Sequence, residues 1–195
     1  RNEPAERGPS PWFRSAATAD AVCGGRRGDY PDRVARFEDG WDVVGPVQAE
    51  VFLVWRHENG VKLTGPCGAD AWYLQLAEAD HPVEVVDRTV ADVVGPPRLV
   101  HSTSWRRERG GVVLTFLVVI DPGQVGEMAS VPIMRSDLAR SQARAAPAVI
   151  AGTQVLEHAL RHLAWLAGDD PVVAGQLDPQ WRQILAGYAP EPFRA

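Results

Sequence analysis

Apolar segments separated by turn signals predict a series of β-strands from residue 33 onward. The expected strands are residues 33–37, 41–44, 51–57, 61–64, 71–76, 99–107, 112–120 and a last one near 131–134. Asp39-Gly40, Asn59-Gly60 and Arg109-Gly110-Gly111 predict hairpins between consecutive strands, because Asx and Gly tolerate a positive φ. The 112–120 segment is apolar at both parities, so we expect both of its faces to be covered.

One amphipathic helix is predicted over residues 82–94. Pro82 suits a first helical turn, Asp80 or His81 supplies a cap, and Gly95-Pro96-Pro97 ends the helix. At 100° per residue its apolar stripe contains Val83, Val86, Val90, Val93 and Val94. Glu84, Arg88 and Asp92 follow one another at i, i+4 and i+8 on the other side. The helix is therefore expected to lie on the sheet with a charged ridge facing outward.

The last third of the chain is predicted to be helical. A polar helix from Ser136 precedes a longer one that ends near Ala167, and two short helices open at Asp170-Pro171 and Asp178-Pro179. Residues 1–30 have no apolar period and predict an irregular arm. The expected organisation is an arm (1–30), an α/β core (31–135) and C-terminal helices on that core (136–195). The expected fold is an α/β/α sandwich with a mixed, mostly antiparallel sheet.

Composition narrows the class of protein. The 195 residues are 45% hydrophobic, and their formal charge of −5 has the wrong sign for a general nucleic-acid binder. No apolar stretch is long enough to span a membrane. Cys23 and Cys67 lack a C-x-x-C spacing and no secretory signal is evident, which predicts a cytoplasmic protein with reduced thiols. A single lysine among 20 basic residues is typical of a high-GC bacterium.

The order of elements over residues 45–135 resembles the Nudix hydrolase fold, whose signature is G-x5-E-x7-R-E-U-x-E-E-x-G-U, with U aliphatic. Four positions of the predicted helix match this signature: Arg88, Val90, Asp92 and Gly95. In the same frame Asp80 takes the upstream Glu position and Leu74 takes the first Gly position. Two carboxylate positions of the motif hold Thr89 and Val93 instead.

These replacements determine what the resemblance implies. Nudix chemistry uses several carboxylates on one helix to hold divalent cations, and of these motif positions only Asp92 keeps a metal-ligating oxygen. The resemblance therefore implies a non-catalytic domain that binds a small phosphate-bearing ligand or a protein partner. One alternative is an active hydrolase that uses Glu84, Asp87 and Asp92 with Mg²⁺ or Mn²⁺. In another, the ridge is a solvated, ion-paired face.

A second group of candidate binding residues lies in the 99–107 strand. Strict alternation would place His101, Thr103, Trp105 and Arg107 on one face, and Ser102, Ser104 and Arg106 on the other. A tryptophan beside guanidinium groups can stack a base and hold a phosphate. The alternative is that Trp105 packs across strands and that the arginines solubilise the hairpin end.

A third group lies on the long C-terminal helix. His158 and His162 have the i, i+4 spacing that can clamp zinc, although no nearby cysteine completes a site. They share a face with Trp165, opposite the core stripe of the same helix. We expect that face to pack against the terminal helix or against another subunit. In the second case the protein is a homodimer or a structural protein assembled through these helices.

Overall fold

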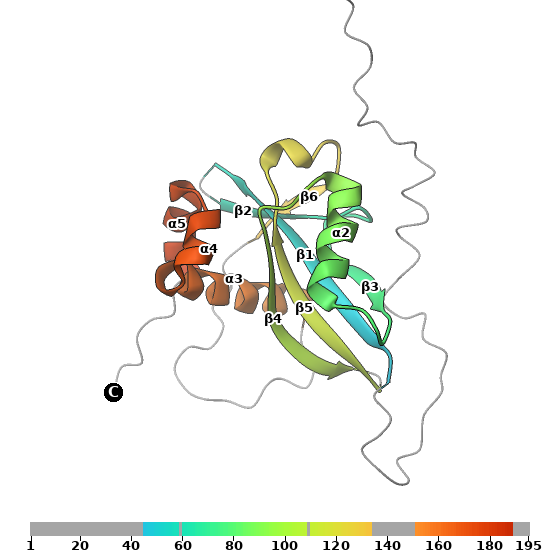
Figure 1. Ribbon diagram of the computed structural model, residues 1–195. Helices are drawn as coiled ribbons and strands as arrows, with labels where there is room; N and C mark the ends of the chain where they lie inside the picture. The colour runs from blue at the N-terminus through green and yellow to red at the C-terminus, as the bar shows by residue number, and fades with distance from the viewer. Residues whose placement is uncertain (1–44, 59, 109, 134–150, 189–195) are drawn as a thin grey trace, which may run out of the picture.

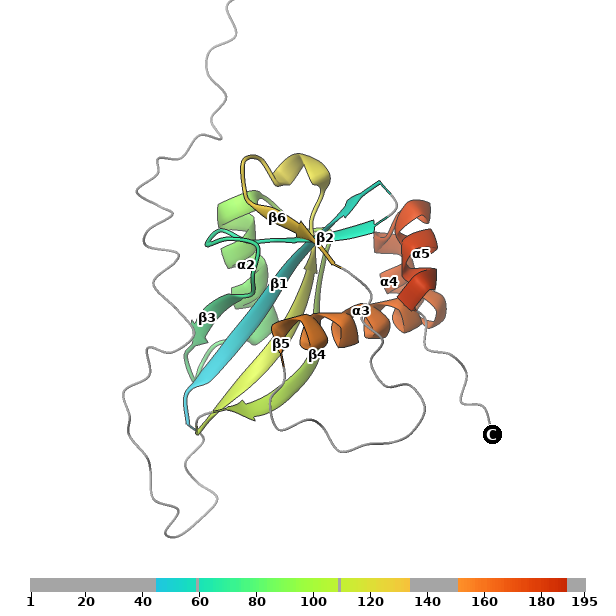
Figure 2. The same ribbon diagram turned by 180° about the vertical axis from the view of Figure 1, so that it is seen from behind.

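The computed structural model describes residues 45–58, 60–108, 110–133 and 151–188. Within them, helices cover both faces of a six-stranded, mostly antiparallel sheet (Figures 1 and 2). The elements in chain order are β1 (Val47–His57), β2 (Gly60–Thr64), β3 (Trp72–Leu76), α2 (Pro82–Val94), β4 (Leu99–Glu108), β5 (Gly111–Val119), η1 (Pro122–Gln124), β6 (Ser130–Pro132), α3 (Gly152–Asp169), α4 (Pro171–Gln176), α5 (Pro179–Leu185) and η2 (Ala186–Tyr188). The predicted mixed α/β fold with C-terminal helices is confirmed.

Strand β1 organises the sheet. Its first half pairs with β3 and its second half with β2, both antiparallel, while β5 runs parallel along its other side. The path through the sheet is β4-β5-β1-β2-β6, so β4 lies at one edge. The eleven-residue strand β1 therefore pairs directly with β2, β3 and β5.

Each face of the sheet has its own apolar core. Alternate residues of β1 and β5, such as Val51 and Phe116, pack with Val86 and Val90 of α2. The intervening residues pack with the C-terminal helices in a second core: Phe52, Val54, Leu117 and Val119 from the strands, and Leu156, Leu160, Leu163 and Trp181 from the helices. Residues 115–120 are buried throughout, which confirms that both faces of this strand are covered.

Helix α2 has the predicted bounds, with Pro82 in its first turn and Gly95 at its C-cap with a φ of 94°. Two details of the expectation were wrong. His81 is the N-cap but makes no side-chain cap, and the Asp80 carboxylate instead accepts a hydrogen bond from the backbone N–H of Ala77. The apolar stripe is also narrower than predicted, because Val83 and Val93 are each 38% exposed.

The C-terminal helices begin where the Asp-Pro pairs place them. The Asp170 carboxylate accepts hydrogen bonds from the N–H groups of Val172 and Val173 at the start of α4. At the start of α5, Asp178 accepts one from Trp181, and it also pairs with Arg56 of β1 at 3.4 Å. These caps fix two short helices that their length alone would leave marginal. The expected arm (1–30), the hairpin over 33–44 and the helix from Ser136 lie outside the described residues.

Candidate functional site

A β-bulge in β4 determines which face each candidate residue occupies. Ser102 pairs with Phe116 and Ser104 pairs with Thr115, so two steps along β4 match one step along β5 and Thr103 is the extra residue. A bulge of this kind reverses the side-chain parity beyond it. The expectation of strict alternation across residues 101–107 was therefore wrong. His101 and Arg106 face the C-terminal helices, whereas Trp105 and Arg107 share the face covered by α2.

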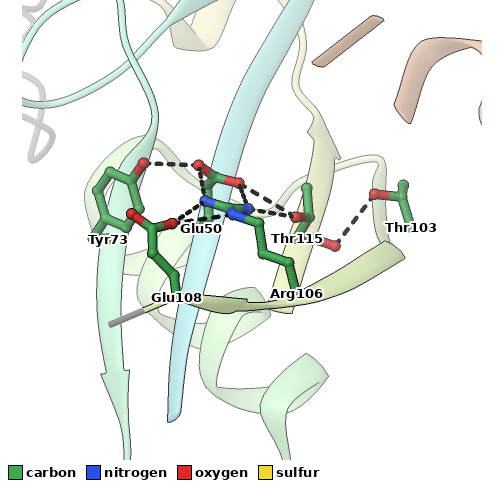
Figure 3. Close-up of polar contacts among 6 residues, drawn as sticks. All are labelled: Glu50, Tyr73, Thr103, Arg106, Glu108 and Thr115. Atoms are coloured by element: carbon green, nitrogen blue, oxygen red, sulfur yellow. Dashed lines mark hydrogen bonds and ion pairs between the residues drawn. The ribbon is translucent and has the colours of Figure 1, made fainter. Parts of the chain in front are cut away.

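Arg106 belongs to a buried ion cluster centred on Glu50 (Figure 3). Glu50 is 0% exposed. Its two carboxylate oxygens accept hydrogen bonds from Arg106 Nη1 at 2.6 Å and Nη2 at 3.0 Å. The Tyr73 hydroxyl donates to the same carboxylate at 2.7 Å, and the Thr115 hydroxyl donates at 3.3 Å. The guanidinium also donates from Nε to Glu108 at 3.1 Å.

This geometry makes Arg106 a structural residue. Burial alone would lower the pKa of its guanidinium, but the hydrogen bonds and charges of Glu50 and Glu108 outweigh burial and raise it. Every nitrogen of the guanidinium has a carboxylate partner, so none is left to hold a phosphate. Of the two neighbouring arginines predicted to bind a ligand, Arg106 instead ties β4 to β1.

Trp105 and Arg107 remain exposed on the opposite face of the same strand. Trp105 is 67% exposed, and its register partner Leu114 lines the core beneath α2. Arg107 is exposed too, and no carboxylate of the described residues pairs with it. The pair offers a flat aromatic surface and a free guanidinium on one side of the sheet, which is the chemistry expected from the sequence.

The ridge of α2 also lies on this side of the molecule. Glu84, Arg88 and Asp92 are all exposed, and no ion pair joins these three side chains, so the alternative of an ion-paired face is not what the structure shows. The Thr89 hydroxyl, which stands at a motif carboxylate position, donates to the backbone oxygen of Val85 in its own helix at 2.7 Å. The Thr89 hydroxyl is therefore already used in a hydrogen bond within its own helix.

His101 and His162, proposed separately as ligand and metal residues, are brought together by the fold. His101 Nε2 lies 3.3 Å from His162 Nδ1, which joins β4 to α3. The His162 ring stacks on Trp165, with centroids 5.9 Å apart and planes 18° apart. Trp165 is 53% exposed, so about half of its surface faces solvent. His158 is exposed, and the described residues contain no cluster of three or more His, Cys, Asp or Glu suited to a metal ion.

Cys67, in the turn between β2 and β3, takes part in a disulfide bond. The expectation of a reduced thiol is therefore wrong for this residue. Its only possible partner within the chain, Cys23, lies outside the described residues. Disulfides persist mainly in oxidising compartments, and the cytoplasmic location stays a prediction.

The disulfide predicts a simple labelling result. Under denaturing conditions without reductant, iodoacetamide should not label Cys67, because its sulfur is in a disulfide bond. After reduction with dithiothreitol it should add two carbamidomethyl groups, one for each cysteine of the sequence. Intact mass spectrometry measures both states. Labelling of two thiols before reduction would show that the bond is absent in solution.

Only one signal in the sequence points to the Glu50 cluster. Glu50 lies between Ala49 and Val51, directly before the apolar segment of β1, and a charge in this position needs a buried partner. Its partners Tyr73, Arg106 and Thr115 lie 23 to 65 residues further along the chain. Local pattern could not identify them.

In the described part of the chain, no helix combines the length and apolar character needed to cross a membrane. Comparison with known proteins gave no match, either to a protein-family model or to a curated protein.

Proposed function

We propose that this chain is a Nudix-like domain that binds a small phosphate-bearing ligand without hydrolysing it. The order of elements from β1 to α3 is the order on which the resemblance rests, and α2 has the length and C-terminal glycine of the motif helix. The motif's metal-holding carboxylates are replaced at Thr89 and Val93. These features support a domain that keeps a binding surface but not the ordinary metal centre.

The observation that carries the proposal is the exposed pair Trp105 and Arg107. The bulge at Thr103 turns both side chains to the α2 face, while Arg106 stays locked to Glu50 on the other face. An exposed indole stacks well on a planar ring such as a base, and a free guanidinium makes bidentate hydrogen bonds to a phosphate. A nucleoside phosphate combines both groups and is the ligand class we favour.

Thermal-shift and calorimetric titration with a panel of nucleoside mono-, di- and triphosphates tests this proposal. A ligand that binds only the folded state should raise the melting temperature of the parent, and the rise should grow with the logarithm of the ligand concentration once this exceeds the Kd. Trp105→Ala and Arg107→Leu should each lose most of that shift. Trp165→Ala is the matched control, because it removes another largely exposed tryptophan, from α3, and should leave the shift unchanged. An equal loss in all three variants, or no shift in the parent, contradicts the proposal.

The α2 ridge predicts a second result. Asp92→Asn should change the free energy of unfolding by about 0.5 kcal/mol or less, because Asp92 is exposed and has no ion-pair partner on the ridge. Millimolar Mn²⁺ should shift the melting curves of parent and variant equally, since one carboxylate cannot offset the dehydration of the ion. A metal-dependent rise in the parent that disappears in the variant would instead favour the active hydrolase, with Glu84 and Asp87 as further ligands.

A second candidate function is association through the C-terminal helices. Trp165 and Val172 are 53% and 71% exposed on α3 and α4, which is unusual for large apolar side chains. Light scattering after size-exclusion chromatography distinguishes this candidate. A homodimer that becomes monomeric in Trp165→Ala would support it, and a monomeric parent would remove it.

A further inference from the structure

The contact between His101 and His162 joins strand β4 to helix α3. The same two layers are also held together by apolar packing and by the ion pair between Arg56 of β1 and Asp178 at the start of α5. His101 lies on the edge strand β4, before the bulge, with its side chain on the face covered by α3. His162 lies in the second half of α3. The 3.3 Å separation of Nε2 and Nδ1 is a hydrogen bond in which one ring donates and the other accepts. The centroids of the two rings are 5.1 Å apart, and Trp165 stacks on the His162 ring.

We propose that the His101–His162 contact is a pH-sensitive latch that fastens the second half of α3 and the start of α4 to strand β4 and releases when both rings are protonated. A doubly protonated pair has donors only, so its hydrogen bond is lost and two like charges face each other. Leu156 and Leu160 hold the first half of α3 on the core, and Leu163 holds its second half there as well, so release removes the polar contact to β4 and leaves this apolar packing in place. Release is therefore local.

Burial and the neighbouring histidines favour the neutral form of the pair near pH 7. Burial and then the charge of His162 lower the pKa of His101, and Asp170 at the start of α4 opposes them in part. Burial and then His158 lower the pKa of His162. From β5, the register partner of His101 is the apolar Leu117. His158 is exposed on the same helix, four residues before His162.

The sign of the pH dependence follows from these directions. Both histidines bind protons less readily in the folded chain than in the unfolded chain, whose histidines have a pKa of about 6.5. Above that pH both rings are neutral in the folded and in the unfolded chain, so their protonation does not lower the free energy of unfolding. As the pH falls below about 6.5, the unfolded or locally opened state takes up protons first, and the latch loses stability until the folded pKa values are passed.

Hydrogen–deuterium exchange of the full chain at pH 7.5 and 5.5, corrected for intrinsic rates, tests the latch. In the parent, amides of residues 162–176 should lose up to about tenfold of their protection per histidine at pH 5.5, one pH unit below the pKa of a histidine in the unfolded chain. Amides of α2 and β1 serve as internal references and should keep theirs. In His101→Gln, which keeps a hydrogen-bonding side chain but cannot become charged, the pH-dependent loss should shrink. His158→Gln is the control and should retain most of it.

Histidine ring NMR titration of the parent gives a readout that needs no variant. Two histidine resonances should titrate below pH 6.5 and should shift together, because protonation of one ring affects the other. Equal protection of residues 162–176 at both pH values would overturn the latch. So would independent titration of all histidines near 6.5, or an undiminished loss in His101→Gln.

Discussion

Arg106→Leu should lower the free energy of unfolding by about 3–5 kcal/mol, the cost of leaving one partner of a buried ion pair uncompensated. Glu50 has no exposed surface, and without Arg106 its described hydrogen-bond partners are the hydroxyls of Tyr73 and Thr115. Urea unfolding monitored by circular dichroism measures the change. Arg107→Leu is the matched control, because Arg107 is the exposed neighbour on the opposite face. Its stability should stay within about 0.5 kcal/mol of the parent.

A double variant separates the charge from the packing. If the loss in Arg106→Leu comes from the orphaned carboxylate, then Glu50→Leu combined with Arg106→Leu should be more stable than Arg106→Leu alone, since no buried charge remains unpaired. Simple addition of the two single losses would mean that the cluster contributes through packing only. A parent-like Arg106→Leu would show that the cluster is open to water.

Thr115→Asp should be the second severe change, with a loss of about 3–5 kcal/mol. Thr115 is 0% exposed, and its hydroxyl lies 3.3 Å from a carboxylate oxygen of Glu50, so an aspartate there places two like charges together in the core. Thr115→Val keeps the shape and removes only the hydrogen bonds, which should cost about 1 kcal/mol.

Leu114→Asp is the comparison on the other face of β5. Leu114 is only partly buried, at the end of the α2 core, so the new carboxylate can reach water and the loss should be clearly smaller than in Thr115→Asp. Chemical unfolding of the three variants in parallel gives the order. Equal losses at 114 and 115 would show that the two faces of β5 are equally closed at this end of the sheet.

Much of the fold could be predicted from local signals. Pro82 and Gly95 fix the bounds of α2 because each has a specific backbone role at a helix end, and the Asp-Pro pairs at 170 and 178 do the same for α4 and α5. The continuous apolar segment of β5 indicated burial on both faces. These features depend on residues within one turn or one strand, so a single sequence carries them.

The candidate site could not be predicted to the same degree. No residue near Thr103 marks the bulge, and one extra residue there exchanges the faces of Trp105 and Arg106. The Glu50–Arg106 pair and the His101–His162 contact join positions 56 and 61 residues apart. Both depend on strand register and on helix docking, and neither leaves a periodic trace in the sequence. The chemistry of single residues was therefore predictable, while their partners were not.

A single incubation separates binding from turnover. The nucleoside phosphate that gives the largest thermal shift is held at saturating concentration with the parent and millimolar Mg²⁺. Ion-exchange chromatography then measures the ligand over several hours. The ligand should be recovered intact. Calorimetry on the same sample should show saturable binding, and Trp105→Ala should abolish this binding. Steady release of phosphate or of a nucleoside monophosphate that Asp92→Asn stops would contradict it.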